Sequence, residues 1–395
     1  MTNSDIYILS AKRTAIGTFG GTLKDFEPAD LGAVAARAAI AEAGIEAGAI
    51  GNVVFGMVLP TQPRDAYLAR IIGMNAGLPV EVPAMTINRL CGSGLQAILT
   101  AAHSITVGDA EIALAGGAEV MSRAPYYAPS VRWGAKMGDA MLVDGLNGGL
   151  TDPFNNGLMG VTAENVADRY DISRELQDEV AAESHRRAAQ AIAEGRFTSQ
   201  IAPVEVRQRK QTISFEVDEH VRAETTAEGL SGLRTIFRKD GGSVTAGNAS
   251  GINDGAAAVI LASESAVKKH GLKPMARLVS WGHAGVDPAY MGIGPVPATR
   301  QALERAGLTV GDLDLVESNE AFAAQACAVA KELGFDPEKT NPNGSGISLG
   351  HPVGATGAIN TTKLVHELHR TSGKHGLATM CIGGGQGIAA IFERV

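Results

Sequence analysis

Residues 85–106 read MTINRLCGSGLQAILTAAHSIT. A short apolar stretch leads into a turn of small residues and then into an amphipathic helical pattern, with Cys91 at the junction. We expect the sharp turn to need Gly92 and Gly94, because glycine adopts backbone conformations that other residues avoid. The arrangement is similar to the strand-turn-helix elbow that presents a serine nucleophile in other enzymes. The stretch therefore predicts an α/β fold that presents Cys91 at a loop.

The position of Cys91 suggests a reactive thiol. At a helix N-terminus, free backbone N–H groups and the helix dipole favour an anion. We therefore expect the pKa of Cys91 to fall below the free value of about 8.5. A free cysteine is more often a small buried hydrophobe, and this stretch alone does not decide between the two interpretations.

The pattern of helix, glycine and strand occurs twice in the chain. One predicted helix ends at Gly44 and another at Gly307, and an apolar strand pattern follows each. These glycines are 263 residues apart, and the same offset places CGSG at 91–94 on GATG at 354–357. Each copy ends in a strand followed by glycines, at 112–120 and 379–387. The repeat predicts two duplicated α/β halves whose layers face each other.

The middle of the chain interrupts this repeat and is interpreted as an inserted domain. The expected domains are an N-terminal half of residues 1–121 and 251–273, an insert at 122–250, and a C-terminal half at 274–395. Residues 186–239 hold ten Lys or Arg against seven Asp or Glu. This surplus is either an ordinary solvated surface or a docking surface for a phosphate-bearing ligand.

Two further clusters carry candidate chemistry. His351 lies in the glycine-rich segment 344–358, GSGISLGHPVGATGA, in the loop that the repeat matches to the loop of Cys91. A histidine beside a cysteine is the pairing that generates a thiolate nucleophile. Cys381 begins CIGGGQG, where successive glycines expose backbone N–H groups that suit an oxyanion. Cys327 lies at apolar helical spacing and is predicted to be core.

Composition excludes several classes of protein. The chain has 395 residues with 34 Lys and Arg against 42 Asp and Glu, which disfavours a nucleic-acid binder. The start has no secretory pattern, and the apolar stretch 376–392 contains five glycines, so we expect two strands and no membrane span. Three widely spaced cysteines predict no zinc site and a cytoplasmic location.

Taken together, the motifs resemble those of the thiolases over essentially the whole chain. The segments that carry the resemblance, in chain order, are RTAIGTFGG, NRLCGSGLQA, GGAEVMSRAP, MGVTAENVA, TAGNASGINDGAAA, NEAFAAQACAV, NPNGSGISLGHPVGATGA and CIGGGQGIAA. The chain is most similar to the short-chain, biosynthetic-type acetyl-CoA acetyltransferases of this family. The resemblance implies a five-layered αβαβα fold with an inserted loop domain, and a homotetramer built as a dimer of dimers.

The resemblance also implies roles for the candidate residues. Cys91 would take the acyl group as a thioester after His351 accepts its proton, and Cys381 would be the acid and base of the condensation step. His351 and a water held by Asn319 would stabilise an enolate. The backbone N–H groups of Cys91 and Gly383 would hold the tetrahedral intermediate. This chemistry needs no metal or redox cofactor, because coenzyme A and acyl-CoA are substrates.

For coenzyme A, the resemblance points to the insert and its neighbours. The residues implied are Arg222 at the adenine and phosphate end, Leu233 and Phe237 along the nucleotide, Ala246, Ser250 and Gly251 beside the pantetheine, and Met159, Met291 and Phe322 at the acyl end. The family usually has histidine where this chain has Leu158, and Gly229 and Leu230 also differ from the commoner residues. These differences leave acyl chain length open.

Three alternatives are weighed against a short-chain thiolase. A ketoacyl synthase would need two histidines, or a histidine and an asparagine, where this chain offers Cys381. A non-catalytic coenzyme A or lipid-binding scaffold should have lost one of the four residues Cys91, Asn319, His351 and Cys381. A degradative thiolase of longer chains would use the same residues, and the sequence leaves that alternative open.

Overall fold

The computed structural model describes residues 5–209 and 211–395. It is built on a ten-stranded sheet with the order β12-β13-β14-β11-β1-β10-β5-β3-β4, and β2 pairs with β10. The strands are β1 Ile6–Arg13, β2 Gly17–Thr18, β3 Asn52–Gly56, β4 Ala84–Ile87, β5 Ile112–Val120, β10 Asn253–Ser263, β11 Ala276–Gly285, β12 Leu315–Ser318, β13 His375–Ile382 and β14 Gln386–Arg394. β3 pairs in parallel with β4 and β5, and β12 with β13, whereas the other pairs are antiparallel. The sheet is therefore mixed, with parallel pairs toward its two ends.

The sheet consists of two halves that meet edge to edge. β1 of the first half pairs with β11 of the second through Tyr7 with Arg277 and Ile8 with Ala276. Within each half, two long antiparallel strands pair along most of their length, β5 with β10 and β13 with β14. Because this junction is short, the two halves can differ in orientation while they remain in one sheet.

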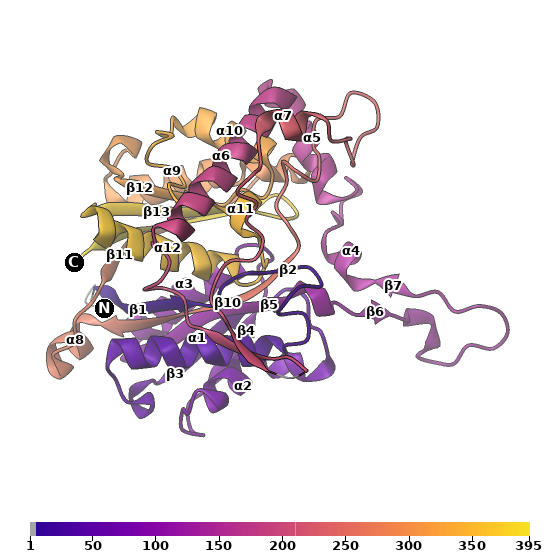
Figure 1. The fold of residues 1–395 in the computed structure, drawn as a ribbon. Helices are drawn as coiled ribbons and strands as arrows, with labels where there is room; N and C mark the ends of the chain where they lie inside the picture. The colour runs from indigo at the N-terminus through magenta and orange to yellow at the C-terminus, as the bar shows by residue number, and fades with distance from the viewer. Residues whose placement is uncertain (1–4, 210) are drawn as a thin grey trace.

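Six main helices pack against the two halves of the sheet and complete the five layers that the resemblance implies (Figure 1). They are α1 Pro28–Ala43, α2 Leu68–Asn75, α3 Ser93–Val107, α9 Pro295–Ala306, α10 Ala323–Leu333 and α12 Thr356–Thr371. The central core packs side chains of α3 and α12 between the two halves of the sheet. A second core lies under α1 and α2, and a third under α9 and α10. The αβαβα arrangement is confirmed, because each half buries one face on the shared pair α3 and α12.

The internal repeat is also confirmed, and its offset holds for several elements. The first residues of β3 and β12, of β5 and β13, and of α3 and α12 are each 263 positions apart. The helices α1 and α9 end at Gly44 and Gly307, both with a φ of 65°. The repeat is incomplete at β4, because the matching segment of the second half forms the short helix α11, Gly346–Leu349.

The two copies touch at glycines that are themselves related by the repeat. A Cβ on Gly94 of α3 would lie 2.6 Å from the backbone N of Ala358, and one on Gly357 of α12 would lie 2.2 Å from the backbone N of Leu95. Each helix therefore packs its first turn against the backbone of the other. The contact has internal twofold symmetry, and it brings the loop of Cys91 beside the loop of His351.

The expected reason for glycine in the turn is wrong. Gly92 has a φ of −81°, and the left-handed residue of this turn is Leu90, with a φ of 47°. Gly92 is needed for space, because a Cβ there would lie 2.6 Å from Ile382 Cδ1. Close packing between the halves, and not backbone conformation, explains the small residues.

The segment between β5 and β10 carries its own elements. They are β6 Tyr126–Tyr127, β7 Val143–Asp144, α4 Gly145–Gly149, α5 Met159–Tyr170, α6 Arg174–Ala193, β8 Val204–Arg207, β9 Thr212–Phe215 and α7 Ala227–Ser231. A buried ion pair ties it to the sheet, since Arg13 Nη1 and Nη2 donate to Asp218 at 2.7 and 3.0 Å. β6 and β7 lie on an arm that projects from the body (Figure 1). α8 Glu264–His270 connects β10 to β11.

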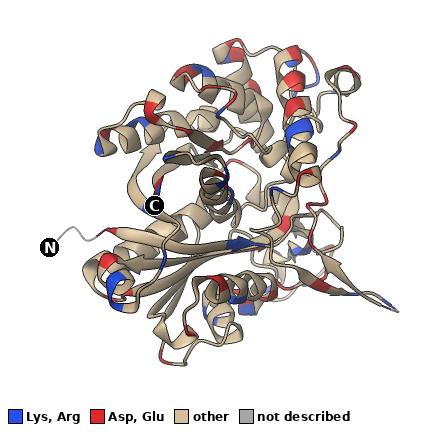
Figure 2. Cartoon of the chain, turned by 60° about the vertical axis from the view of Figure 1, so that its left-hand side comes forward, with Lys and Arg blue, Asp and Glu red and all other residues tan. Residues whose placement is uncertain are grey.

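Charged side chains lie mainly on the outer helices and loops, with both signs interspersed (Figure 2). Residues 375–394 form the hairpin of β13 and β14, as the sequence predicts. By length and composition, Leu90–Val107 is apolar enough to span a membrane, but 61% of it is buried inside the fold. Its composition matches the place of α3 in the central core.

Candidate active site

Cys91 lies in the loop between β4 and α3, immediately before the first turn of the helix. The residue is half-buried, and the backbone N–H groups of Gly383 and of Cys91 itself face its sulfur. Burial nevertheless raises the pKa of the Cys91 thiol, and the nearby Glu119 carboxyl acts in the same direction. The expectation of a lowered pKa is therefore wrong for this structure, because desolvation outweighs the favourable backbone N–H groups. The thiol needs a base to become a thiolate.

His351 supplies a base whose tautomer follows from its neighbours. Thr356 Oγ1 donates to Pro352 O at 2.9 Å and lies 2.7 Å from His351 Nδ1. Since that hydroxyl proton is already used, Nδ1 carries the ring proton and donates it to Thr356. Nε2 is then the unprotonated nitrogen, and Asn319 Nδ2 donates to it over a long contact of 3.4 Å. Burial lowers the pKa of His351 to about 4, so the ring is neutral near pH 7.

The loop of His351 is held from two sides. The backbone N–H of His351 donates to Asn253 Oδ1 at 2.9 Å, and Gly354 N–H donates to Glu119 Oε2 at 2.9 Å. Glu119 also accepts the N–H groups of Val58 and Leu59. These contacts leave the imidazole little freedom, which suits a group that must transfer protons at a fixed point.

Cys381 is fully buried near the end of β13, where it pairs with Gly387 of β14. Burial, and next the neighbouring Cys91, raise the pKa of the Cys381 thiol. The hairpin turn that follows contains Gly383 and the left-handed Gly384 and Gly385, with φ of 77° and 83°. The turn therefore aims a backbone N–H at Cys91 while the strand holds a second thiol close to the first.

Asn319 follows directly after β12 and is fully buried. Its Oδ1 has no hydrogen-bond partner among residues 5–209 and 211–395. Gly346 packs against it, since a Cβ there would lie 2.9 Å from that oxygen. Asn341 fixes the strand end, because its Oδ1 accepts Ser318 N–H at 2.9 Å. The free amide oxygen beside His351 is a ready acceptor for a water.

The structure thus brings the predicted catalytic residues into one place. Gly383 N–H faces Cys91, Cys91 is close enough to raise the pKa of Cys381, and Asn319 lies beside His351. Val353, two residues after His351, packs in the same apolar cluster as Cys91. A nucleophilic thiol, a neutral imidazole, a second thiol and backbone N–H donors are the parts needed for acyl transfer through a thioester.

A cavity of about 520 Å³ lies beside this cluster, lined in part by the insert. Seven of the nine predicted ligand-binding residues line it: Met159, Arg222, Phe237, Ala246, Ser250, Gly251 and Phe322. Met159 and Phe322 also pack against the apolar cluster that contains Cys381. The cavity therefore leads from the outer insert to the side of the second thiol. Leu158 lines it as well.

The other two predicted residues lie away from the cavity wall. Leu233 is exposed and packs against Gly247, where a Cβ would lie 2.6 Å from Leu233 Cδ1. Met291 is buried in the cluster with Cys381, behind Met159 and Phe322. Met291 therefore supports the inner end of the cavity from behind.

Phe19 and His220 are among the wall residues that sequence reasoning missed. Phe19 lies within the quoted motif RTAIGTFGG, which is the signal that could have marked it, and its ring is exposed. His220 is two positions before Arg222, and burial, together with that positive charge, lowers its pKa to about 4. A neutral histidine beside an arginine makes this end of the cavity suited to an anionic or polar group.

Cys327 is confirmed as a core residue of α10, and burial raises its pKa to about 12. Within residues 5–209 and 211–395, no group of three or more His, Cys, Asp or Glu side chains is placed to hold a metal ion.

Comparison with known proteins defines the class. The family model described as thiolase, N-terminal domain, matches residues 6–265, and that described as thiolase, C-terminal domain, matches residues 272–394. The chain belongs to the thiolase family, whose named relatives are acyltransferases.

Individual relatives match over nearly the whole chain. It is 61% identical to the beta-ketothiolase BktB of Cupriavidus necator, over 99% of both proteins. It is 51% identical to an acetyl-CoA acetyltransferase of Pseudomonas aeruginosa, again over 99% of both. The crystal structure of human mitochondrial 3-ketoacyl-CoA thiolase in complex with CoA is 49% identical, with a TM-score of 0.96 over 99% of this chain and 98% of that one.

Proposed function

We propose that the protein is an acetyl-CoA C-acetyltransferase, a β-ketothiolase that condenses acetyl-CoA with a short acyl-CoA and cleaves 3-oxoacyl-CoA in reverse. The observation that carries the proposal is the cluster itself: Gly383 N–H faces Cys91, Cys91 perturbs Cys381, and the loop of the neutral His351 packs on Cys91 through Val353. The names of the relatives, beta-ketothiolase and acetyl-CoA acetyltransferase, support the same reaction.

In the first half-reaction, Cys91 takes the acyl group. His351 Nε2 accepts the thiol proton, and the sulfur attacks the thioester carbonyl carbon. The backbone N–H groups of Cys91 and Gly383 stabilise the oxyanion of the tetrahedral intermediate. The intermediate collapses to acyl-Cys91, and coenzyme A leaves as a thiol after it takes the proton of Cys381. Cys381 is then a thiolate, which its raised pKa makes a strong base.

In the second half-reaction, the Cys381 thiolate removes a proton from the methyl group of a second acetyl-CoA. The protonated His351 Nε2 and a water on Asn319 Oδ1 stabilise the enolate oxygen. The enolate carbon attacks the carbonyl of acyl-Cys91, the new carbon–carbon bond forms, and the Cys91 sulfur leaves with a proton from His351. Thiolysis is the reverse sequence.

The cavity is the proposed site for coenzyme A. Arg222 would pair with phosphate at the outer end, while Ala246, Ser250 and Gly251 would lie along the pantetheine arm. Met159 and Phe322 would guide the thioester toward Cys381. The reaction uses coenzyme A and acyl-CoA as substrates and calls for no other cofactor.

We also propose that the protein is a cytoplasmic homotetramer assembled as a dimer of dimers. The arm around β6 and β7 supports an assembly, because its apolar side chains have no cover in the single chain. Trp133 is 94% exposed and Met137 is 100% exposed, with Tyr126, Met141 and Leu142 also exposed. Apolar side chains gathered on one projecting segment mark an interaction surface.

The test is coenzyme A-dependent cleavage of 3-oxoacyl-CoA substrates of four to ten carbons, with Cys91→Ser as the blank. Cleavage restricted to four and five carbons supports the short-chain assignment. Efficient cleavage at eight or ten carbons supports the second candidate, a degradative thiolase of longer chains. That candidate is favoured by apolar Leu158 in the cavity wall and by relatives named mitochondrial 3-ketoacyl-CoA thiolase. Lack of cleavage at every length contradicts both.

A further inference from the structure

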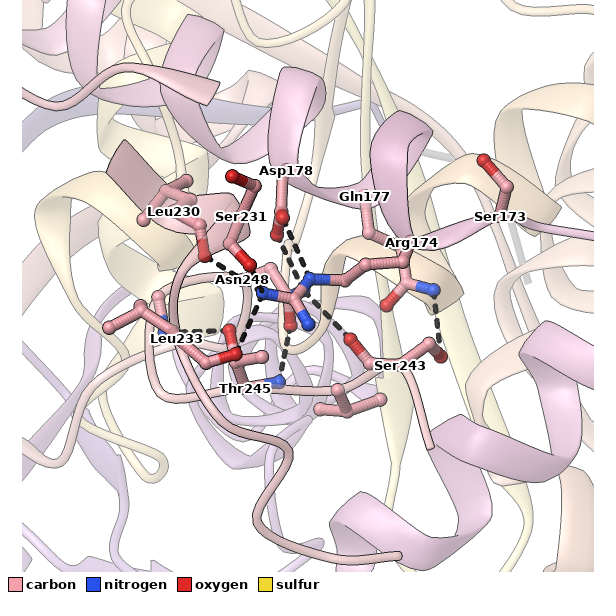
Figure 3. A network of polar contacts seen from close by, with 12 residues as sticks. Ser173, Arg174, Gln177, Asp178, Leu230, Ser231, Leu233, Ser243, Thr245 and Asn248 are labelled. Atoms are coloured by element: carbon pink, nitrogen blue, oxygen red, sulfur yellow. Dashed lines mark hydrogen bonds and ion pairs between the residues drawn. The ribbon is translucent and has the colours of Figure 1, made fainter. Parts of the chain in front are cut away.

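We propose that the ion pair between Arg174 and Asp178 is a positioning device that holds two walls of the cavity and thereby sets the affinity for coenzyme A. The inference rests on the proposed use of this cavity for coenzyme A. Both residues lie in the first turns of α6, and both point toward the loops that bound the cavity (Figure 3). Neither lines the cavity itself, so they act through those loops.

Arg174 holds the first wall. Its Nη2 donates to the carbonyl oxygens of Leu230, Leu233 and Ser231 at 2.8, 3.0 and 3.4 Å. These carbonyls lie in and just after the last turn of α7, where a positive charge is favourable. The same segment runs on to Phe237 in the cavity wall. The guanidinium therefore fixes how this segment leaves its helix.

Asp178 connects Arg174 to the second wall. Its Oδ2 accepts Arg174 Nε at 2.7 Å, and its Oδ1 accepts Asn248 Nδ2 at 2.9 Å. Asn248 in turn accepts the N–H of Thr245 through Oδ1 at 2.8 Å, which closes the turn that carries Ala246. Ser250, two residues further on, also lines the cavity. One carboxylate thus links both walls.

The two walls also touch each other directly. Gly247 packs on the α7 segment, since a Cβ there would lie 2.5 Å from Leu230 Cδ2 and 2.6 Å from Leu233 Cδ1. Gln177, on the same turn of α6, donates to Ser243 Oγ at 2.9 Å. One turn of α6 therefore fixes two loops that contact each other. Because these cavity walls are ordered before the ligand arrives, less conformational entropy is lost on binding.

The chemistry of the pair predicts which substitutions matter. Asp178 and Asn248 are almost fully buried, so losing a partner leaves a polar group unpaired in the interior. Arg174 uses its planar fork to reach an acidic side chain and several carbonyls at once, which a lysine ammonium does not reproduce. Arg174→Lys keeps the charge and should weaken the contacts with Asp178 and the α7 segment in part. Arg174→Gln removes the charge and should weaken these contacts more.

The experiment compares two acceptors in thiolysis of acetoacetyl-CoA by the full chain. One is coenzyme A, and the other is N-acetylcysteamine, which carries the reactive end without the nucleotide. For Arg174→Gln, we expect the KM for coenzyme A to rise about tenfold, the scale of one charge-assisted hydrogen bond, with kcat within about twofold. Arg174→Lys should fall between this variant and the wild type. The kcat/KM for N-acetylcysteamine should stay within about twofold of the wild type.

Arg186→Gln on the same helix is the matched control, because Arg186 pairs with the exposed Glu183 and neither residue lines the cavity. It should leave both acceptors unchanged. Equal losses with both acceptors in Arg174→Gln and Arg174→Lys would overturn the inference, since they indicate a general structural role.

A wild type without thiolysis would instead contradict the proposed function. Calorimetry with coenzyme A alone then decides the inference separately. If Arg174→Gln binds coenzyme A about tenfold more weakly than the wild type does, which is the scale of one hydrogen bond, the inference is supported. Equal affinities of the two proteins overturn the inference.

Discussion

At the scale of single residues, Thr356 decides where the His351 ring proton sits. Its hydroxyl donates to Pro352 O and accepts from His351 Nδ1, which leaves Nε2 free to accept a proton. Removing the hydroxyl removes the acceptor and with it the preference for this tautomer.

Thr356→Val should therefore lower kcat for thiolysis by about ten- to hundredfold, within the range of one general base. Thr356→Ser keeps the hydroxyl and should retain most of the activity. Steady-state kinetics on 3-oxoacyl-CoA measures both variants. The matched control is Thr361→Val, which removes a buried hydroxyl that donates to Gly357 O on the same helix. Equal losses in Thr356→Val and Thr361→Val would contradict the tautomer assignment.

Protonation of His351 links the site to stability. Its folded pKa of about 4 lies below its ordinary value of 6.5, so the unfolded chain binds more protons between these values. The stability linked to His351 is therefore fully present above pH 6.5 and is lost as the pH drops toward 4. His351→Gln should lose less stability between pH 7 and pH 5 than the wild type does. Urea unfolding at both pH values measures this, and equal losses would show that the folded imidazole titrates normally.

Side-chain chemistry could be predicted from the sequence only in part. Cys91, His351 and Cys381 were recognisable because glycine-rich motifs mark each of them, whereas Asn319, in the motif NEAF, followed from the family resemblance alone. The raised pKa of Cys91 was not predictable, because it depends on burial between two halves of the chain. A motif gives the residue type, whereas desolvation depends on everything packed around it.

At the scale of elements, the contact between α3 and α12 depends on glycine. Gly94→Ala places a Cβ against the backbone of Ala358, and backbone atoms cannot move aside cheaply. We expect a loss of about 1–3 kcal/mol or more in the free energy of unfolding, or failure to fold.

Gly357→Ala, at the matching position of the repeat, should behave in the same way. The control is Gly148→Ala in α4, where a Cβ would meet nothing within 4 Å and no loss is expected. Thermal unfolding of the three variants measures the effect. A stable Gly94→Ala protein would mean that the helices can separate without cost.

Helices and strands of the repeat were predictable because their periodicity and terminal glycines are local features. Helix ends at Gly44 and Gly307, and the hairpin of β13 and β14, followed the sequence. The short helix α11 lies where the repeat would place the counterpart of β4. It was not predictable, because the repeat offset continues through this segment without a break. The places of Leu233 and Met291 also depend on how loops fold back over the sheet.

At the scale of the whole molecule, the Arg13–Asp218 pair joins the insert to the sheet. Both side chains are fully buried, and Asp218 also accepts Ile16 N–H. Arg13→Met leaves a buried carboxylate without its cation, so the free energy of unfolding should fall by about 3–5 kcal/mol. Lys268→Met, which breaks the exposed pair with Glu264, should leave the free energy of unfolding almost unchanged, because solvent screens an exposed ion pair. Urea denaturation compares them, and equal effects would contradict a joining role.

The duplication explains why the proposed catalytic cluster draws on both halves. Cys91 comes from the first copy, whereas Asn319, His351 and Cys381 come from the second. The central claim is that the acyl group passes through Cys91 and that Cys381 acts after it.

The most direct test is peptide mass spectrometry of Cys381→Ala after incubation with acetyl-CoA. We expect an acetyl group on the peptide that contains Cys91, no condensation product, and no acetyl group in the variant that also carries Cys91→Ser. Full condensation activity in Cys381→Ala, or acetylation that persists without Cys91, would contradict the proposed mechanism.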